Sequence, residues 1–428
     1  MTTSAYSHPF PFPKLAGVLC IAWSALVGAC GDDSSGQTSG TGGGASTSSG
    51  SGSGTGGSDN QGGNDNQGGN DNQGGGDNQG GGPSSGDTIR FIGRFDTTDP
   101  AGPRFSWPGS AIATRFTGTS ISARFNDTAP QDAPDYFQVV IDGKPEGVLA
   151  VHSQEDLYVV AEGLADGEHD LLLHRRTETL VGVTQFLEFI PEQGEQLLPA
   201  PPAPERRIEV IGDSISAGYG IDGLNETCPF TSATENNYLA YSALTARMLE
   251  ADATIIAWSG RGVYRNYDGE AVEPMPEIYG RTIASEAQPA WDFSSWVPQV
   301  VVINLGTNDF SINVPGPATF DAPFKQAYAG LVETVRGHYP EAHIFTTVGP
   351  MLSDSYPPDA NALTRARTLI TEVVDERTDG GDTRVHFVEF PPHDGAVNGL
   401  GCDYHPSAKT NELMAEQLAE AIKEEVGW

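Results

Sequence analysis

The fold is decided by the stretch RRIEVIGDSIS, residues 206–216. Its apolar run at 208–212 predicts a strand buried on both faces, and the Asp-Ser pair that follows predicts a tight turn into a helix. Similar strands alternate with amphipathic helical stretches along the rest of the chain. Strands are predicted at 253–258, 300–306, 343–349 and 385–390, and helices at 235–250, 320–337, 360–377 and 407–425. This alternation predicts a three-layer α/β domain with a parallel sheet over residues 205–428.

The segment before this domain, residues 87–198, has a different pattern. Short runs rich in β-branched and aromatic residues, such as YFQVVIDG and VTQFLEFI, are separated by turn signals such as Asp142-Gly143. Seven or more strands without a helical period predict a β-sandwich, of jelly-roll type. The proline-rich stretch at 198–204 is expected to be a stiff joint between the two domains.

The N-terminus has the pattern of a targeting signal at 1–29. Lys14 precedes an apolar run at 15–29, which is too short to span a bilayer comfortably. The run ends in Val27-Gly28-Ala29-Cys30, which resembles the bacterial lipobox, where the cysteine becomes the lipidated first residue after cleavage. We therefore expect an exported lipoprotein held by acyl chains at the cell envelope or cell surface. A secretory peptide cleaved nearby is the alternative.

Residues 30–86 are predicted to be a disordered linker. Four hexapeptides, DNQGGN twice and DNQGGG twice, run in register from 59 to 82. A β-helix would need an apolar residue in each repeat to stack inside, and these repeats have none. A flexible tether rich in Gly, Asn and Ser is the better interpretation.

The charge excludes some classes of partner. The chain has 57 acidic against 23 basic side chains, a formal net charge of −34. Such a chain repels phosphate backbones and anionic lipid headgroups, so we expect no nucleic-acid partner and no membrane contact except through the lipid anchor. No Cys/His cluster has the spacing of metal ligands, and no glycine-rich phosphate loop is present, so we expect no metal and no cofactor.

The candidate chemistry lies where the predicted parallel strands end, as in other open α/β sheets. Ser214 follows the first strand, and the run WSGRG at 258–262 follows the second. Asn308 lies in GTND after the strand at 300–306, and His405 lies in CDYHP just before the last helix. Ser214 alone could be an ordinary helix cap. His405, however, lies where a general base could reach it.

In this order the four motifs resemble the conserved blocks of the SGNH (GDSL) hydrolase superfamily. Further runs narrow the resemblance: ENNYLAYSALTAR at 235–247, WSGRGVYRNY at 258–267, PMPEIYGRT at 274–282, WDFSSW at 291–296 and GCDYHPS at 401–407. With the β-sandwich in front, residues 88–428 resemble carbohydrate esterase family 2. Those enzymes join a jelly roll to an SGNH domain and remove O-acetyl groups from plant polysaccharides such as xylan and glucomannan.

The resemblance implies a role for each motif residue. Ser214 would be the nucleophile and His405 the general acid and base. The oxyanion hole would consist of the Ser214 N–H, the Gly262 N–H and the Asn308 amide, with Gly260 as a less favoured substitute for Gly262. Such donors usually supply the largest share of acyl-transfer catalysis.

One position departs from the superfamily pattern. The superfamily has an Asp three residues before the His, where this chain has Cys402. Asp403 lies two residues before His405, as in GCD-x-HP members of the esterase family, and is predicted to orient His405 from a locally extended loop. A backbone carbonyl that orients His405 in place of the carboxylate is the alternative.

The cysteines suggest a disulfide. Cys20 would leave with the signal and Cys30 would be lipidated, which leaves Cys228 and Cys402 in an oxidising compartment. A bridge between them would pin the His405 loop near the nucleophile. Two buried reduced thiols are the alternative.

Several further residues have two interpretations. Three aromatic residues are predicted to line a sugar-binding cleft, or else belong to the core: Tyr264, Tyr267 and Trp296. His386 alternates with apolar neighbours and is expected to be structural, whereas His393 is a rival base. Asp213 and Asp309 are expected to order their loops through hydrogen bonds.

The sequence as a whole predicts an exported serine esterase that removes acetyl groups from a poly- or oligosaccharide through an acetyl-enzyme intermediate. A lipid or aryl esterase with the same machinery is one alternative. A carbohydrate-binding surface lipoprotein with an idle hydrolase domain is another.

Overall fold

The computed structural model describes residues 87–428. The predictions of a signal at 1–29 and a linker at 30–86, Cys30 included, lie outside the described residues.

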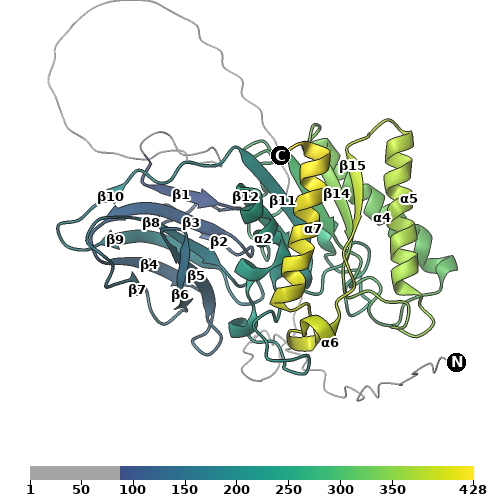
Figure 1. Ribbon diagram of the computed structural model, residues 1–428, viewed down its shortest axis with the longest axis horizontal. Helices are drawn as coiled ribbons and strands as arrows, with labels where there is room; N and C mark the ends of the chain where they lie inside the picture. The colour runs from purple at the N-terminus through teal and green to yellow at the C-terminus, as the bar shows by residue number, and fades with distance from the viewer. Residues whose placement is uncertain (1–86) are drawn as a thin grey trace, which may run out of the picture. The chain divides into compact units, whose positions relative to one another are not determined.

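Two antiparallel sheets form the first part of the described chain (Figure 1). The six-stranded sheet consists of β1 (Ile89–Ile92), β3 (Ala111–Thr117), β8 (Glu168–Arg175), β5 (Asp135–Ile141), β6 (Lys144–Val151) and β10 (Leu197–Leu198), which pairs with β3. The four-stranded sheet has the order β2 (Arg104–Phe105), β9 (Thr184–Pro191), β4 (Ile121–Asp127) and β7 (Leu157–Ala161).

Alternation of side chains along the strands builds the core between these two sheets. In β4, Ile121, Ala123 and Phe125 are buried, while the residues between them are partly exposed. The Phe125 ring stacks on Phe137 of β5 in the other sheet, with the ring centroids 5.7 Å apart. Inward-facing side chains of both sheets thus form one apolar cluster.

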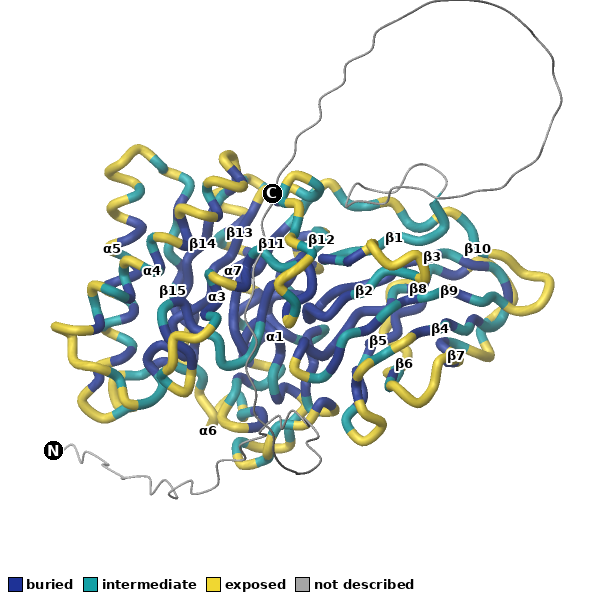
Figure 2. Tube along the Cα trace, turned by 180° about the vertical axis from the view of Figure 1, so that it is seen from behind, coloured by how far each residue is buried: buried dark blue, intermediate teal, exposed yellow. Residues whose placement is uncertain are grey.

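The second part is a five-stranded parallel sheet. Its order is β12 (Ala251–Ala257), β11 (Arg206–Gly212), β13 (Val300–Asn304), β14 (His343–Val348) and β15 (Val385–Glu389). Every residue of the central strand β13 is buried, because helices cover both faces of the sheet. Figure 2 shows these strands as an almost continuous buried layer.

Helices on the two faces complete three layers. The helices α3 (Met275–Ile278), α4 (Pro317–His338) and α5 (Ala362–Asp379) pack on one face. The opposite face carries α2 (Tyr241–Met248) and α7 (Ala408–Val426). Short elements complete the domain: α1 (Ser214–Ala217), α6 (Gly395–Asn398), η1 (Ser232–Thr234), η2 (Asn237–Leu239) and η3 (Cys402–Tyr404). The predicted fold class, an antiparallel β domain before a parallel α/β domain, is confirmed.

One predicted helix is shorter in the structure. Within the stretch 235–250, the extended Ala240 separates α2 from η2, which begins at Asn237. The Asn237 Nδ2 donates to the carbonyl oxygens of Ser216 and Ala217, at 3.0 and 3.2 Å. Among residues 87–428, the helices are all too short or too polar to cross a membrane.

A buried ion pair joins the sandwich to the α/β domain, and both lie within the compact unit Gly74–Trp428. Arg94 Nη2 lies 3.2 Å from Glu209 Oε2, and both side chains are fully buried. The hydroxyls of Tyr279 and Tyr339 donate to the same carboxylate, at 2.5 and 3.2 Å. Trp107, from the sandwich, packs within the apolar cluster of the α/β domain.

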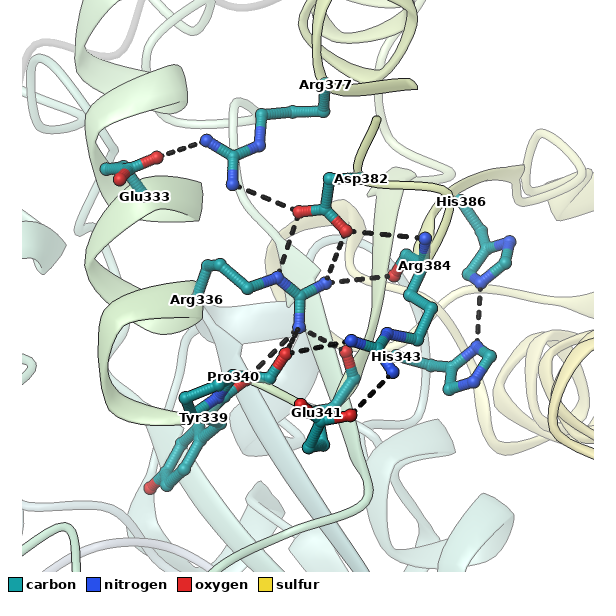
Figure 3. A network of polar contacts seen from close by, with 11 residues as sticks. Glu333, Arg336, Tyr339, Pro340, Glu341, His343, Arg377, Asp382, Arg384 and His386 are labelled. Atoms are coloured by element: carbon teal, nitrogen blue, oxygen red, sulfur yellow. Dashed lines mark hydrogen bonds and ion pairs between the residues drawn. The ribbon is translucent and has the colours of Figure 1, made fainter. Parts of the chain in front are cut away.

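A second polar network lies where β14 and β15 begin (Figure 3). Arg336, on α4, donates through Nε and Nη2 to the Asp382 carboxylate, at 2.9 and 3.0 Å. The Nδ1 of His343 lies 3.0 Å from Nε2 of His386. His386 is therefore part of the packing between β14 and β15. It lies where these strands begin, whereas Ser214 follows the C-terminal end of β11, at the opposite edge of the sheet.

Candidate active site

Ser214 is held at the turn between β11 and α1. The preceding residue, Asp213, caps the helix, because its Oδ1 accepts the Ile215 N–H at 3.0 Å. Ser214 is the first residue of α1, so its own N–H has no acceptor within the helix. Burial raises the pKa of Asp213 to about 7.

His405 meets Ser214 across the end of the sheet. Its Nε2 lies 2.9 Å from Ser214 Oγ, although 191 positions separate the two residues in the chain. On the other side of the ring, Nδ1 lies 3.2 Å from the carbonyl oxygen of Cys402 and 3.1 Å from that of Asp403. Because carbonyls only accept, Nδ1 carries the proton and Nε2 is free to accept one from Ser214.

Burial also sets the charge of this imidazole. It lowers the pKa of His405 to about 4, and the two carbonyl contacts oppose the shift only in part. His405 is therefore neutral near pH 7, which is the form that a general base requires.

The predicted role of the Asp403 carboxylate is wrong. Its Oδ2 accepts the Tyr219 hydroxyl at 2.7 Å and the Phe230 N–H at 3.2 Å, and it is the Asp403 carbonyl that faces His405. The loop is not extended, because Asp403 and Tyr404 have left-handed backbones with φ of 50° and 62°. This turn directs the carboxylate away from the imidazole.

Tyr219 is a residue of the site that the sequence did not reveal. Its ring lies between two others, with centroids 4.2 Å from His405 and 4.3 Å from Phe230. Asp403 holds its hydroxyl, so this carboxylate contacts the tyrosine and not the imidazole, although its charge opposes the lowering of the His405 pKa. The sequence held one signal for Tyr219: the residue comes just after α1, the helix that begins at the nucleophile, and that segment must pass close to the base.

A disulfide closes the same loop. Cys228 and Cys402 are bonded, with a sequence separation of 174. Backbone bonds continue the junction: the Asp403 N–H donates to the Cys228 carbonyl at 3.2 Å, and the Cys402 N–H donates to that of Gly220 at 3.0 Å. The carbonyls that face His405 are thus covalently tied to the segment that follows α1.

The two candidate glycines of the oxyanion loop differ in the partners of their N–H groups. The Gly262 N–H is buried and donates to Asn266 Oδ1 at 3.2 Å, so it is already used. A Cβ at Gly262 would lie 1.9 Å from the Arg265 carbonyl oxygen, so any larger residue would clash with the backbone there. Gly260 has φ of 81°, is partly exposed, and its N–H has no hydrogen-bond partner among residues 87–428. Gly260, the substitute for Gly262, is thus the glycine of this loop whose N–H is free.

Two carboxylates order the loops around these donors, as expected. Asp309 accepts the N–H groups of Val263, Tyr264 and Arg265 at 2.7–2.9 Å, and burial raises its pKa to about 6. Asn308 Nδ2 donates to the Arg261 carbonyl at 2.9 Å and to Asp213 Oδ2 at 3.2 Å. These bonds place the amide beside the residue that precedes Ser214.

The three predicted sugar-binding aromatics lie in different places. Tyr267 donates its N–H to the Gly260 carbonyl at 2.8 Å, and its side chain is 56% exposed beside the oxyanion loop. Tyr264 packs with its ring edge against Phe320 at the border of the apolar core and is partly exposed. Trp296 lines a cavity of about 180 Å³ with Arg207 and other residues at the start of the strands. The prediction for Trp296 is wrong, because that edge is opposite to Ser214.

The rival base does not reach the nucleophile. His393 lies in the loop after β15, where its N–H donates to the Pro350 carbonyl, and burial lowers its pKa. It is His405, and not His393, that is bonded to Ser214. In the described part of the chain, no group of three or more His, Cys, Asp or Glu side chains is arranged to hold a metal ion.

Comparison with known proteins identifies the family. Residues 91–201 match the carbohydrate esterase 2 N-terminal domain, and residues 210–413 match the GDSL-like lipase/acylhydrolase family. A solved family two carbohydrate esterase from Clostridium thermocellum, in complex with cellohexaose, is 43% identical. It aligns with a TM-score of 0.74 over 79% of this chain and 99% of that chain. The chain belongs to carbohydrate esterase family 2. It is thus a carboxylic ester hydrolase.

Two curated relatives of this family 2 esterase extend the comparison. A cellulase/esterase CelE from Acetivibrio thermocellus is 43% identical over 79% of this chain, and the chain covers 40% of that longer protein. An acetylxylan esterase / glucomannan deacetylase from Cellvibrio japonicus is 27% identical over 81% of this chain and 91% of the relative.

Proposed function

We propose that this esterase removes O-acetyl groups from plant-type polysaccharides, with acetylated xylan or glucomannan as substrate. The observation that carries the proposal is the 2.9 Å contact between His405 Nε2 and Ser214 Oγ in a family 2 chain. Support for the substrate class comes from relatives whose names specify acetylxylan and glucomannan, and from one that was solved with cellohexaose bound. These relatives favour polysaccharide deacetylation over lipid hydrolysis.

The geometry of Ser214 and His405 supports the following reaction. Ser214 Oγ attacks the acetyl carbonyl carbon while His405 Nε2 takes its proton, and the carbonyl oxygen becomes an oxyanion. The N–H groups of Ser214 and Gly260 receive this charge, and the Asn308 amide joins them by giving up its longer contact to Asp213. The carbonyls at Nδ1 stabilise the imidazolium.

The second half of the cycle reverses the proton transfer. The intermediate collapses, His405 protonates the departing sugar oxygen, and Ser214 is left acetylated. Water then attacks the acetyl carbon while His405 takes one of its protons. The second intermediate collapses, His405 returns this proton to Ser214 Oγ, and acetate leaves.

Acetate release tests this proposal. The wild-type protein should release acetate from acetylated xylan or glucomannan and should prefer acetyl to long-chain aryl esters. Ser214→Ala should abolish both activities while the protein stays folded. A preference for long-chain esters would indicate a lipid or aryl esterase. Binding of the polysaccharide without any acetate release would indicate a carbohydrate-binding protein.

We also propose that the protein is an exported lipoprotein. The support is the sequence pattern Val27-Gly28-Ala29-Cys30 after an apolar run, followed by a glycine-rich stretch suited to a tether. Metabolic labelling with a fatty-acid analogue in a bacterial host should mark the wild type and the control Cys20→Ser, but not Cys30→Ser. Equal labelling of Cys30→Ser would refute lipidation at this cysteine.

A further inference from the structure

A carboxylate from the β-sandwich reaches the catalytic domain close to the active site. The chain leaves β8 at Arg175, and residues 176–178 run along the α/β domain. There the Asn237 N–H donates to the Arg176 carbonyl at 2.9 Å. Glu178, at the end of this segment, is fully buried.

Glu178 binds the oxyanion loop with both oxygens. Its Oε2 accepts the Ser259 N–H at 2.7 Å, and its Oε1 accepts the Ser259 hydroxyl. Ser259 is the residue directly before Gly260, whose N–H is the free donor in this loop. On the other side, the Tyr267 N–H donates to the Gly260 carbonyl at 2.8 Å. The donor is thus held between two anchors, and Glu178 is one of them.

A second buried carboxyl supports this arrangement. Glu235 Oε2 accepts the Glu178 N–H at 3.0 Å. Burial raises the pKa of both groups, that of Glu178 to about 7, and the nearby negative charge of Glu178 raises the pKa of Glu235 further. Glu235 thus holds the backbone of Glu178, while both side-chain oxygens of Glu178 accept from Ser259.

Cohesion of the two domains does not by itself explain Glu178. Burying a carboxylate is costly, and apolar residues would hold an interface as well or better. Four ion pairs between the domains leave the loop 258–262 untouched: Arg94 with Glu209, Arg90 with Asp252, Arg104 with Glu286 and Arg176 with Asp222. Glu178 is directed at one peptide of the catalytic machinery.

We propose that Glu178 is a positioning residue: by holding the N–H and the hydroxyl of Ser259, the β-sandwich orients the peptide that follows, so that the Gly260 N–H points at the oxyanion. The sandwich then completes the active site instead of only flanking it. The proposal rests on ester hydrolysis and not on the identity of the polysaccharide. A small acetyl aryl ester is therefore a sufficient substrate for its test.

The full-length protein should show a loss of turnover without a loss of binding. Glu178→Ala should lower kcat by about 100-fold, the effect of a misplaced catalytic group, while KM changes by less than about threefold. Glu178→Gln keeps one acceptor oxygen and should recover kcat to within about tenfold of wild type. Arg90→Ala, which breaks an ion pair across the same interface, is the control and should keep wild-type kcat.

Three results would overturn the proposal. The first is a Glu178→Ala protein with an unchanged melting temperature and kcat within about threefold of wild type. The second is an equal loss of kcat in Arg90→Ala. If Glu178→Ala does not fold, Glu178→Gln is combined with Ser259→Ala. The proposal predicts that the fold-loss of kcat in the double variant is clearly smaller than the product of the fold-losses in the two single variants. A fold-loss equal to that product would be the third contrary result. Because the assay uses a small acetyl aryl ester, its result does not depend on whether the protein deacetylates polysaccharides.

Discussion

The substitution Asp403→Asn separates a Ser–His dyad from a triad. In the structure, Nδ1 of His405 faces two backbone carbonyls at 3.1 and 3.2 Å, which the substitution leaves in place. The Asp403 side chain instead accepts from the Tyr219 hydroxyl at 2.7 Å and the Phe230 N–H at 3.2 Å. An asparagine oxygen can still accept from these donors. We therefore expect Asp403→Asn to remain an active enzyme.

The size of the effect follows from the bonds that change. Replacing a charged by a neutral acceptor weakens a hydrogen bond by about 1 kcal/mol. If this loss reached the transition state in full through Tyr219, kcat would fall about fivefold. In a triad, the same substitution at the carboxylate that holds the histidine can lower kcat by about 10⁴. The two mechanisms differ by roughly three orders of magnitude in the expected result.

The assay is turnover of an acetyl aryl ester across pH, with thermal unfolding measured in parallel. Tyr219→Phe is the matched variant, because it removes only the hydroxyl that Asp403 holds and keeps the ring beside His405. Both variants should stay within about tenfold of wild type. A loss beyond about 1,000-fold in Asp403→Asn, with an unchanged melting temperature, would refute the orientation of His405 by the main chain.

Three further predictions follow. The neutral form of His405 is the active base, and its pKa is lowered to about 4. We therefore expect kcat/KM to persist at pH 5.5 and to fall as the pH passes through about 4. A kcat/KM that is already halved near pH 6.5, the ordinary pKa of histidine, would contradict this. Arg94→Met removes the cation that pairs with the buried Glu209 carboxylate, and should lower the free energy of unfolding in denaturant titrations by about 3–5 kcal/mol. The control Arg115→Ala, at an exposed ion pair, should lower it by less than about 1 kcal/mol. Trp296→Ala should leave kcat and KM on acetylated polysaccharide unchanged, since its cavity lies at the opposite edge of the sheet; a marked rise in KM would place substrate there.

The sequence was sufficient for the fold because each element carries its own local pattern. The residues of β13 are apolar without interruption, which is what a strand covered on both faces requires, and those of β4 alternate as in a half-covered sheet. Ser214 and His405 were identifiable for a related reason. Each lies next to a predicted element, and the ends of parallel strands converge at one edge of the sheet.

What the sequence could not supply is the direction in which a group points. Gly260 and Gly262 are two positions apart in the same loop, and only the structure shows that Asn266 already accepts the Gly262 N–H. The left-handed backbone at Asp403 reverses the direction of its carboxylate, and the extended loop inferred from the sequence did not include this turn. Glu178 reaches Ser259 from another domain, 81 positions away, and no local pattern predicts such a contact.

The most direct test of the account is whether Ser214 carries the acetyl group during turnover. Intact-protein and peptide mass spectrometry after rapid acid quench, with acetylated oligosaccharide in excess, would detect the intermediate. The account predicts that the wild-type protein gains the mass of one acetyl group on the peptide that contains Ser214, and that Ser214→Ala gains none. Acetate release at the full rate by Ser214→Ala, or an acetyl group on another residue of the active protein, would contradict it.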